Sequence, residues 1–149
     1  IIKDLEIPGP AGPIPARLYD ARANRAAGLV MVFYHGGGFV VGNIDTHEPY
    51  CAEAARQLDM PVISIDYRLA PEAPFPAAPE DCEAATRWIA QNIPCTGLVL
   101  SGDSAGGNLT VVTAMALRDG GPAAKSALEE LRELTAKAKE AEGEGRVSE

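Results

Sequence analysis

Five short apolar segments follow one another between residues 5 and 101, each bounded by glycine, proline or polar residues. Segments of this length and spacing are typical of β-strands. In the second segment Ile14, Ala16 and Leu18 alternate with other residues, as in a strand with one buried face. The last three segments are apolar throughout, as in parallel strands covered on both faces. The predicted strands are Leu5–Ile7, Ile14–Tyr19, Gly28–Tyr34, Pro61–Tyr67 and Thr96–Ser101.

Segments with helical apolar spacing follow each of the last three strands. Asp45 and Thr46 offer N-cap oxygens to the first, and the third is apolar nearly all round, which predicts a buried helix. The predicted helices are His47–Leu58, Pro79–Asn92 and Asn108–Arg118. An opening hairpin followed by three strand–helix pairs predicts an α/β fold. We expect a mostly parallel sheet of about five strands with flanking helices and a site at its carboxyl edge.

The character of the chain changes after residue 121. Residues 122–142 are dominated by Ala, Leu, Glu, Lys and Arg, which predicts an appended amphipathic C-terminal helix of the kind found in designed sequences. Residues 143–149 are polar and glycine-containing, which is typical of a disordered tail. We therefore expect three parts: a core at 1–121, the helix and the tail.

Composition narrows the classes of function. With 149 residues, 46% of them hydrophobic, the chain is the size of one soluble domain, and its net charge of −8 argues against nucleic acid or an anionic membrane as partner. No apolar run is long enough to span a membrane and the first residues lack a secretory signal pattern, so we expect a cytoplasmic location. The three cysteines form no C-x-x-C motif, so neither disulfides nor a metal site are expected.

The candidate chemistry begins at Gly102-Asp103-Ser104-Ala105-Gly106, a G-x-S-x-G motif between the last strand and the last helix. In that context the motif predicts a nucleophile elbow, a sharp turn that exposes the serine hydroxyl above the sheet. Ser104 is the candidate nucleophile, and the N–H group of Ala105 is a candidate donor to the oxyanion formed during acyl transfer. Asp103 and Gly106 are expected to support the turn.

A second glycine-rich turn, His35-Gly36-Gly37-Gly38, directly follows the third strand. Gly36 and Gly37 are the candidate oxyanion donors here, with His35 and Gly38 as supporting positions. We expect His35 to brace the loop rather than act as a base, and His47 to lie on the surface or line a pocket. Both glycine motifs after apolar strands should occur together by chance in well under about 1% of chains.

Several segments together resemble the hormone-sensitive-lipase-like carboxylesterases, which have an α/β-hydrolase fold. The matching segments are Ile14–Tyr19, His35–Gly42, Asp45-Thr46-His47, Asp66–Glu72 and Gly102–Asn108. The resemblance covers about residues 1–121. It implies Ser104 as nucleophile, Gly36, Gly37 and Ala105 as oxyanion donors, short- to medium-chain acyl esters as substrates, and no cofactor.

The chain departs from this family after the elbow, where members carry the triad acid and then the histidine. No histidine follows Ser104, and Asp119 is the only later aspartate. We therefore expect a truncated or fused hydrolase core whose activity alone is weak or absent, because the triad aspartate and histidine are missing. The edge left at the strand Gly97–Ser101 predicts a homodimer, or coverage of this edge by the helix at 123–142. Full activity would require a complementary C-terminal half as partner. The alternative is a non-catalytic, engineered assembly module.

Overall fold

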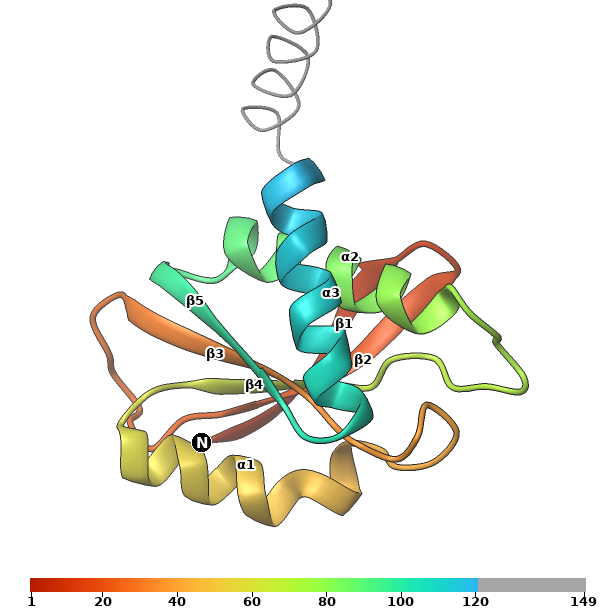
Figure 1. Cartoon of the computed structure of the whole chain (residues 1–149). Coiled ribbons are helices and arrows are strands. Elements are labelled where there is room, and N and C mark those ends of the chain that lie inside the picture. Colours follow the sequence, from red (N-terminus) through yellow and green to blue (C-terminus); the bar gives the residue numbers. More distant parts are fainter. Residues whose placement is uncertain (121–149) are drawn as a thin grey trace, which may run out of the picture. The chain divides into compact units, whose positions relative to one another are not determined.

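The structure, a computed structural model, describes residues 1–120, and Ile1–Ala114 form one compact unit (Figure 1). A second unit begins at Met115, and its described residues continue the last helix. The elements in chain order are β1 (Ile2–Gly9), β2 (Gly12–Tyr19), β3 (Gly28–Tyr34), α1 (Ile44–Leu58), β4 (Val62–Ile65), α2 (Ala77–Asn92), β5 (Cys95–Gly102) and α3 (Ala105–Gly120). This order confirms the predicted hairpin and the three strand–helix pairs.

The five strands form one sheet in the order β1-β2-β4-β3-β5. The pairs β3–β4 and β3–β5 are parallel, whereas β1–β2 and β2–β4 are antiparallel, so the sheet is mixed. The α/β fold class is confirmed. Within the described residues β5 pairs only with β3, so it lies at an edge of the sheet, as predicted from the sequence.

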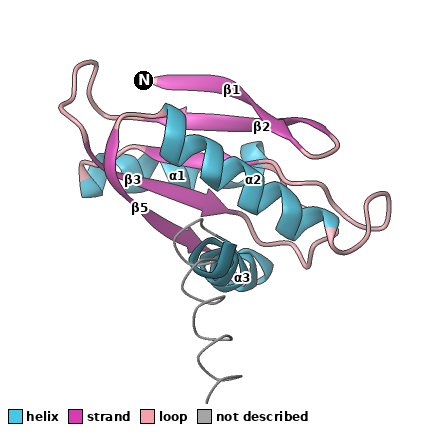
Figure 2. Ribbon diagram, turned by 90° about the horizontal axis from the view of Figure 1, so that it is seen from above, coloured by secondary structure: helices cyan, strands magenta, loops and turns pink. Residues whose placement is uncertain are grey.

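Helices cover both faces of the sheet (Figure 2). On one face α2 and the beginning of α3 bury Cys82, Ala85, Ile89 and Leu109 against the strands. On the other face α1 buries Cys51 and Ala55 against a smaller apolar cluster. The central strands therefore have apolar side chains on both sides, which explains why β3 and β4 read as continuous hydrophobic runs.

Helix α1 begins earlier than predicted because its N-cap is Asn43, not Asp45 or Thr46. The Asn43 side chain accepts a hydrogen bond from the Thr46 N–H at 2.9 Å, and the Thr46 hydroxyl accepts one from the Asn43 N–H at 3.0 Å. This reciprocal arrangement is a capping box with threonine at its third position. The carboxylate of Asp45 instead pairs with Arg17 of β2.

The expectation that the third helix is buried all round was wrong. Leu109 and Thr113 are buried, but Val111 and Val112 are 59% and 37% exposed. In residues 1–120 the sheet ends at β5, and no further element covers this side of α3. The predicted amphipathic helix at 122–142 and the predicted tail at 143–149 lie outside the described residues. Among residues 1–120, no helix combines the length and apolarity required to cross a membrane.

Candidate active site

The turn between β5 and α3 holds Ser104 in a strained backbone conformation. Its φ of 50° lies in the left-handed region, which residues other than glycine rarely adopt. The N–H of Gly106 donates to the Asp103 carbonyl at 2.7 Å, so the helix starts immediately after the serine. Ser104 is exposed. An exposed, strained serine between a strand and a helix has the geometry of a nucleophile elbow.

Glycine at two positions permits this turn to pack closely. A Cβ atom at Gly106 would overlap the carbonyl oxygen of Tyr34 at the end of β3, and one at Gly102 would overlap the carbonyl oxygen of Gly106. Because neither residue carries a side chain, the first turn of α3 lies directly against β3. The elbow is thereby brought to the point where the glycine loop begins.

The glycine loop after β3 folds back on itself. Gly37 and Gly38 have φ values of 127° and 62°, and the N–H groups of Val40 and Val41 donate to the Gly37 carbonyl at 3.1 and 3.0 Å. These φ values favour glycine because other residues are strained there. Within residues 1–120, the N–H groups of Gly37 and Ala105 donate no hydrogen bond, so both remain available to a ligand.

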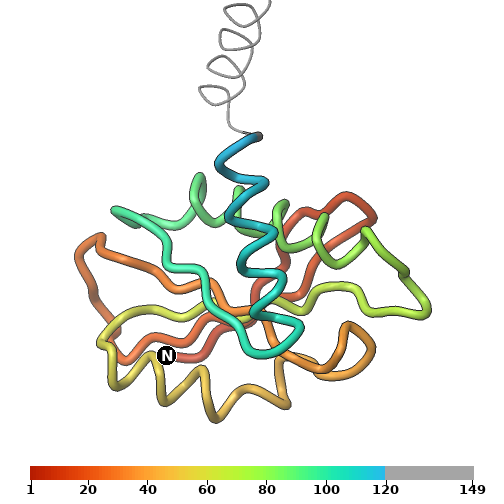
Figure 3. Tube along the Cα trace, viewed as in Figure 1, coloured from red at the N-terminus to blue at the C-terminus, as the bar shows by residue number. Residues whose placement is uncertain are grey.

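The carboxylate of Asp103 joins the two turns, which lie next to each other although they are far apart along the chain (Figure 3). Its Oδ1 accepts the Gly36 N–H at 2.8 Å, and a Cβ at Gly36 would overlap the other carboxylate oxygen. The sequence pattern had assigned the Gly36 N–H to the oxyanion. In this structure that hydrogen is engaged by Asp103.

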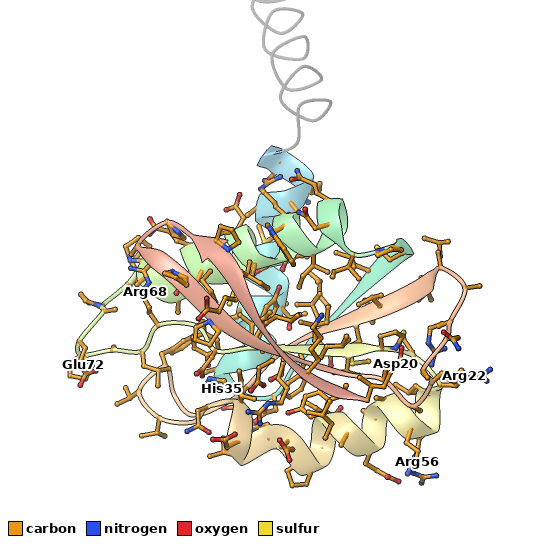
Figure 4. The ribbon with its side chains drawn as sticks, turned by 180° about the vertical axis from the view of Figure 1, so that it is seen from behind. Asp20, Arg22, His35, Arg56, Arg68 and Glu72 are labelled. Atoms are coloured by element: carbon orange, nitrogen blue, oxygen red, sulfur yellow. The ribbon has the colours of Figure 1, made fainter. Side chains whose placement is uncertain are left out.

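His35 is fully buried beneath the glycine loop, and Figure 4 shows it inside the molecule. Its ring stacks on Tyr67 with the centroids 4.4 Å apart, and Nδ1 lies 2.7 Å from the Gly36 carbonyl oxygen. A carbonyl only accepts, so we assign the hydrogen to Nδ1. Burial lowers the pKa of His35, which favours the neutral ring. These contacts brace the loop.

His47, in the first turn of α1, reaches the elbow. Its Nε2 lies 3.3 Å from Asp103 Oδ1, and its side chain is 23% exposed. Within residues 1–120, the hydroxyl of Ser104 has no hydrogen bond to either histidine, and the chain contains only these two. The structure therefore does not assemble a nucleophile and a histidine base from this sequence.

An apolar cavity of about 460 Å³ opens beside the glycine loop. It is lined by Gly38 and Phe39 of the loop, Ala70 and Phe75 of the segment before α2, and Asn108 and Val112 of α3. Such a lining suits a hydrocarbon chain. Ser104 is not among the lining residues, so the cavity is adjacent to the serine rather than around it.

Sequence reasoning missed the part played by Tyr67. Its hydroxyl donates to the His35 carbonyl at 2.5 Å, which fixes the backbone where the glycine loop leaves β3. The residue belongs to the Asp66–Glu72 segment that carried the family resemblance, but no local pattern indicates its partner. Arg68 in the same segment pairs with buried Asp81 at 2.9 Å and ties this loop to α2.

A strained serine between a strand and a helix, beside a glycine loop at the carboxyl edge of an α/β sheet, defines the α/β-hydrolase class. A family model described as the alpha/beta hydrolase fold matches residues 31–142, and the chain belongs to this family. The match extends into residues 122–142, whose composition predicts an appended helix. That division of the chain stays a prediction.

Relatives with similar sequences carry the names of ester hydrolases. Esterase LipI of Mycobacterium tuberculosis is 47% identical over 129 residues, which cover 81% of this chain and 40% of LipI. Human hormone-sensitive lipase is 46% identical over 99 residues, covering 63% of this chain and 9% of the lipase. This chain spans 35–40% of the length of LipI, LipN and NlhH from the same organism.

Solved structures agree with this relationship. An esterase of Pyrobaculum calidifontis superposes with a TM-score of 0.76 at 45% identity, covering 80% of this chain and 40% of the esterase. The thermostable carboxylesterase EstE1 from a metagenomic library superposes with a TM-score of 0.75 at 44% identity, covering 80% of this chain and 42% of EstE1. The hormone-sensitive-lipase-like resemblance is thus confirmed.

Proposed function

We propose that this chain carries the nucleophile and oxyanion part of a serine carboxylesterase that acts on short- to medium-chain acyl esters through Ser104. The observation that carries the proposal is the left-handed backbone of Ser104 at the β5–α3 turn, φ 50°. Strain of this kind costs on the order of 1–3 kcal/mol and persists where the surrounding structure enforces it, often at active sites. The esterase relatives support the same chemistry.

In the proposed reaction the Ser104 Oγ attacks the ester carbonyl carbon while its proton passes to a base. The carbonyl oxygen becomes an oxyanion and accepts hydrogen bonds from the N–H groups of Gly37 and Ala105, which are free of other partners in residues 1–120. Collapse of the intermediate expels the alcohol with a proton, and water then hydrolyses the acyl-serine. Gly36 acts on this site through Asp103 rather than as a donor.

We assign the triad acid and base to a complementary C-terminal half, because no histidine follows Ser104 in this chain. His35 is buried and bonded to the Gly36 carbonyl, and His47 faces Asp103. In subtilisin the loss of the catalytic base alone lowers kcat by about 10⁶, and the oxyanion hole and binding retain about 10³–10⁴ over water. We therefore expect the isolated chain to hydrolyse esters weakly.

Hydrolysis of p-nitrophenyl butyrate tests the proposal. The parent chain is compared with Ser104→Ala and with the matched variant Ser101→Ala, which changes a serine at the end of β5 three residues away. We expect a slow rate above the uncatalysed background, and a butyryl group on Ser104 that mass spectrometry detects in the parent and in Ser101→Ala but not in Ser104→Ala. A parent chain that carries no acyl group on Ser104 after incubation with the ester would exclude Ser104 as the nucleophile.

The free edge of β5 favours a second candidate function, that of a non-catalytic assembly module. Within residues 1–120 this eight-residue strand pairs only with β3, and a long free edge readily pairs with another chain. Antiparallel pairing of two copies would give a symmetric homodimer. Sedimentation over a concentration series should then show a species of twice the 15.6 kDa chain mass, whereas a monomer at every concentration would contradict self-association.

A further inference from the structure

We propose that His47 is a positioning residue: acting through Asp103, it holds the glycine loop against the nucleophile elbow. Its predicted effect on ester hydrolysis rests on the proposed function, whereas its effect on the loop does not. The role is separate from that of a base, because the Nε2 atom of His47 faces the Asp103 carboxylate.

A single carboxylate oxygen connects the three parts of the site. Oδ1 of Asp103 lies 3.3 Å from His47 Nε2 and accepts the Gly36 N–H at 2.8 Å. The contact is an ion pair when His47 is protonated, and Nε2 then donates to the carboxylate, which can only accept. Helix α1, the elbow and the glycine loop thus meet at one atom.

His47 is itself held in place from several sides. The Asn43–Thr46 capping box fixes the first turn of α1, and the Thr46 hydroxyl oxygen lies 2.9 Å from His47 Nδ1. The imidazole packs near the rings of Phe33 and His35, with centroid distances of 5.9 and 5.6 Å. A side chain already ordered in this way loses little conformational entropy when it binds Asp103.

Asp103 requires such an anchor because its side chain is 54% exposed. Apart from the Gly36 N–H and His47, the described residues give this carboxylate no hydrogen-bond or ion-pair partner. Without His47, water competes for the carboxylate, and other rotamers of Asp103 release Gly36. Because glycine-rich backbone has many accessible conformations, the neighbouring Gly37 N–H would then lose its fixed direction.

The direct test compares His47→Leu with His47→Gln, whose side-chain amide reaches a similar position to Nε2 and retains a donor. The readout is the chemical shift of the Gly36 amide proton in NMR spectra of the full chain, with Asp103→Ala as the reference for a broken contact. We expect His47→Leu to move this shift toward the Asp103→Ala value and His47→Gln to preserve it. Tyr50→Phe, a change on the next turn of α1, should leave it unchanged.

The same spectra separate positioning from unfolding. Amide signals of β3 must remain in place in His47→Leu, because a global loss of structure would move them as well. An unchanged Gly36 shift in a folded His47→Leu chain would overturn the proposal. Equal displacement in the Leu and Gln variants would also overturn it, since the donor would then be irrelevant.

The kinetic test measures Ser104-dependent hydrolysis of p-nitrophenyl butyrate. Loss of an oxyanion donor lowers kcat by about 10²–10³, so a misdirected donor should lower it by about 10-fold in His47→Leu, with KM little changed and with rescue in His47→Gln. A change in KM with kcat unchanged in His47→Leu would overturn the positioning role. If the parent shows no Ser104-dependent rate, the proposed function fails, and the Gly36 shift still decides the role of His47.

Discussion

At the scale of single residues, Gly106 shows how closely the site is packed. A methyl group there would overlap the Tyr34 carbonyl oxygen, whereas at the adjacent Gly107 it would lie 3.4 Å from the nearest atom, the Gly102 carbonyl oxygen. Both residues lie in the first turn of α3 and differ mainly in this clearance. Comparing alanine substitutions at Gly106 and Gly107 therefore measures the effect of the close contact between the elbow and β3.

We expect Gly106→Ala to lower the free energy of unfolding by about 1–3 kcal/mol, the cost of overpacking a tight contact. Gly107→Ala should be neutral or stabilising by up to about 1 kcal/mol, because alanine favours helix more than glycine does. Urea denaturation of both variants measures the difference. Equal free energies of unfolding for Gly106→Ala and Gly107→Ala would contradict the close packing of α3 on β3.

His35 should make stability depend on pH. Burial lowers the pKa of its imidazole below the usual value of 6.5. As the pH falls below 6.5 the unfolded chain binds a proton that the folded chain excludes, so the folded state loses stability until the pH reaches the folded pKa. The slope for one proton is at most about 1.4 kcal/mol per pH unit. Asp66, whose pKa burial raises, acts in the opposite sense at lower pH.

Unfolding by urea at several pH values between 5 and 8 checks this prediction. His47→Gln removes the other histidine and should retain the loss of stability below pH 6.5. An NMR titration of the His35 ring should likewise show protonation only below the usual range. A ring that titrates at 6.5 in the folded chain would refute the prediction.

At the scale of elements, α3 is amphipathic in the structure although its sequence is apolar nearly all round. Leu109 is fully buried, whereas Val111 is 59% exposed. Leu109→Ala should therefore lower the free energy of unfolding by about 2–5 kcal/mol, and Val111→Ala should change it by less than about 0.5 kcal/mol. Thermal or urea unfolding distinguishes the two, and a large effect of Val111→Ala would show that another surface covers α3.

The start of α1 shows where sequence reasoning about elements failed. Its apolar positions gave the helix and its C-terminal end at Leu58 correctly, but both Asn43 and Asp45 are good N-cap residues. Asn43 is the N-cap of α1 because Arg17 of β2 binds the Asp45 carboxylate. That contact joins a strand and a helix that are distant in sequence, so no local pattern contains it.

At the scale of the whole molecule, the chain matches part of each esterase relative, 40% of LipI and 42% of EstE1. We predict that the part of EstE1 that this chain does not match raises ester hydrolysis when mixed with it, since that part supplies the proposed acid and base. The expected rise is at least about 10³-fold, a fraction of the 10⁶ attributed to a catalytic base. The same mixture with Ser104→Ala is the control. Activity independent of Ser104 would contradict the complementation.

The sequence by itself determined the order of strands and helices, the two glycine-rich turns and the hydrolase family, because these depend on local periodicity and on contiguous motifs. The tertiary structure alone decided that Asp103 engages the Gly36 N–H and that His47 binds Asp103. The physical reason is the parallel register of β3 and β5, in which Tyr34 lies opposite Gly102. This alignment ends both strands at the same level, so turns 67 residues apart share one carboxylate.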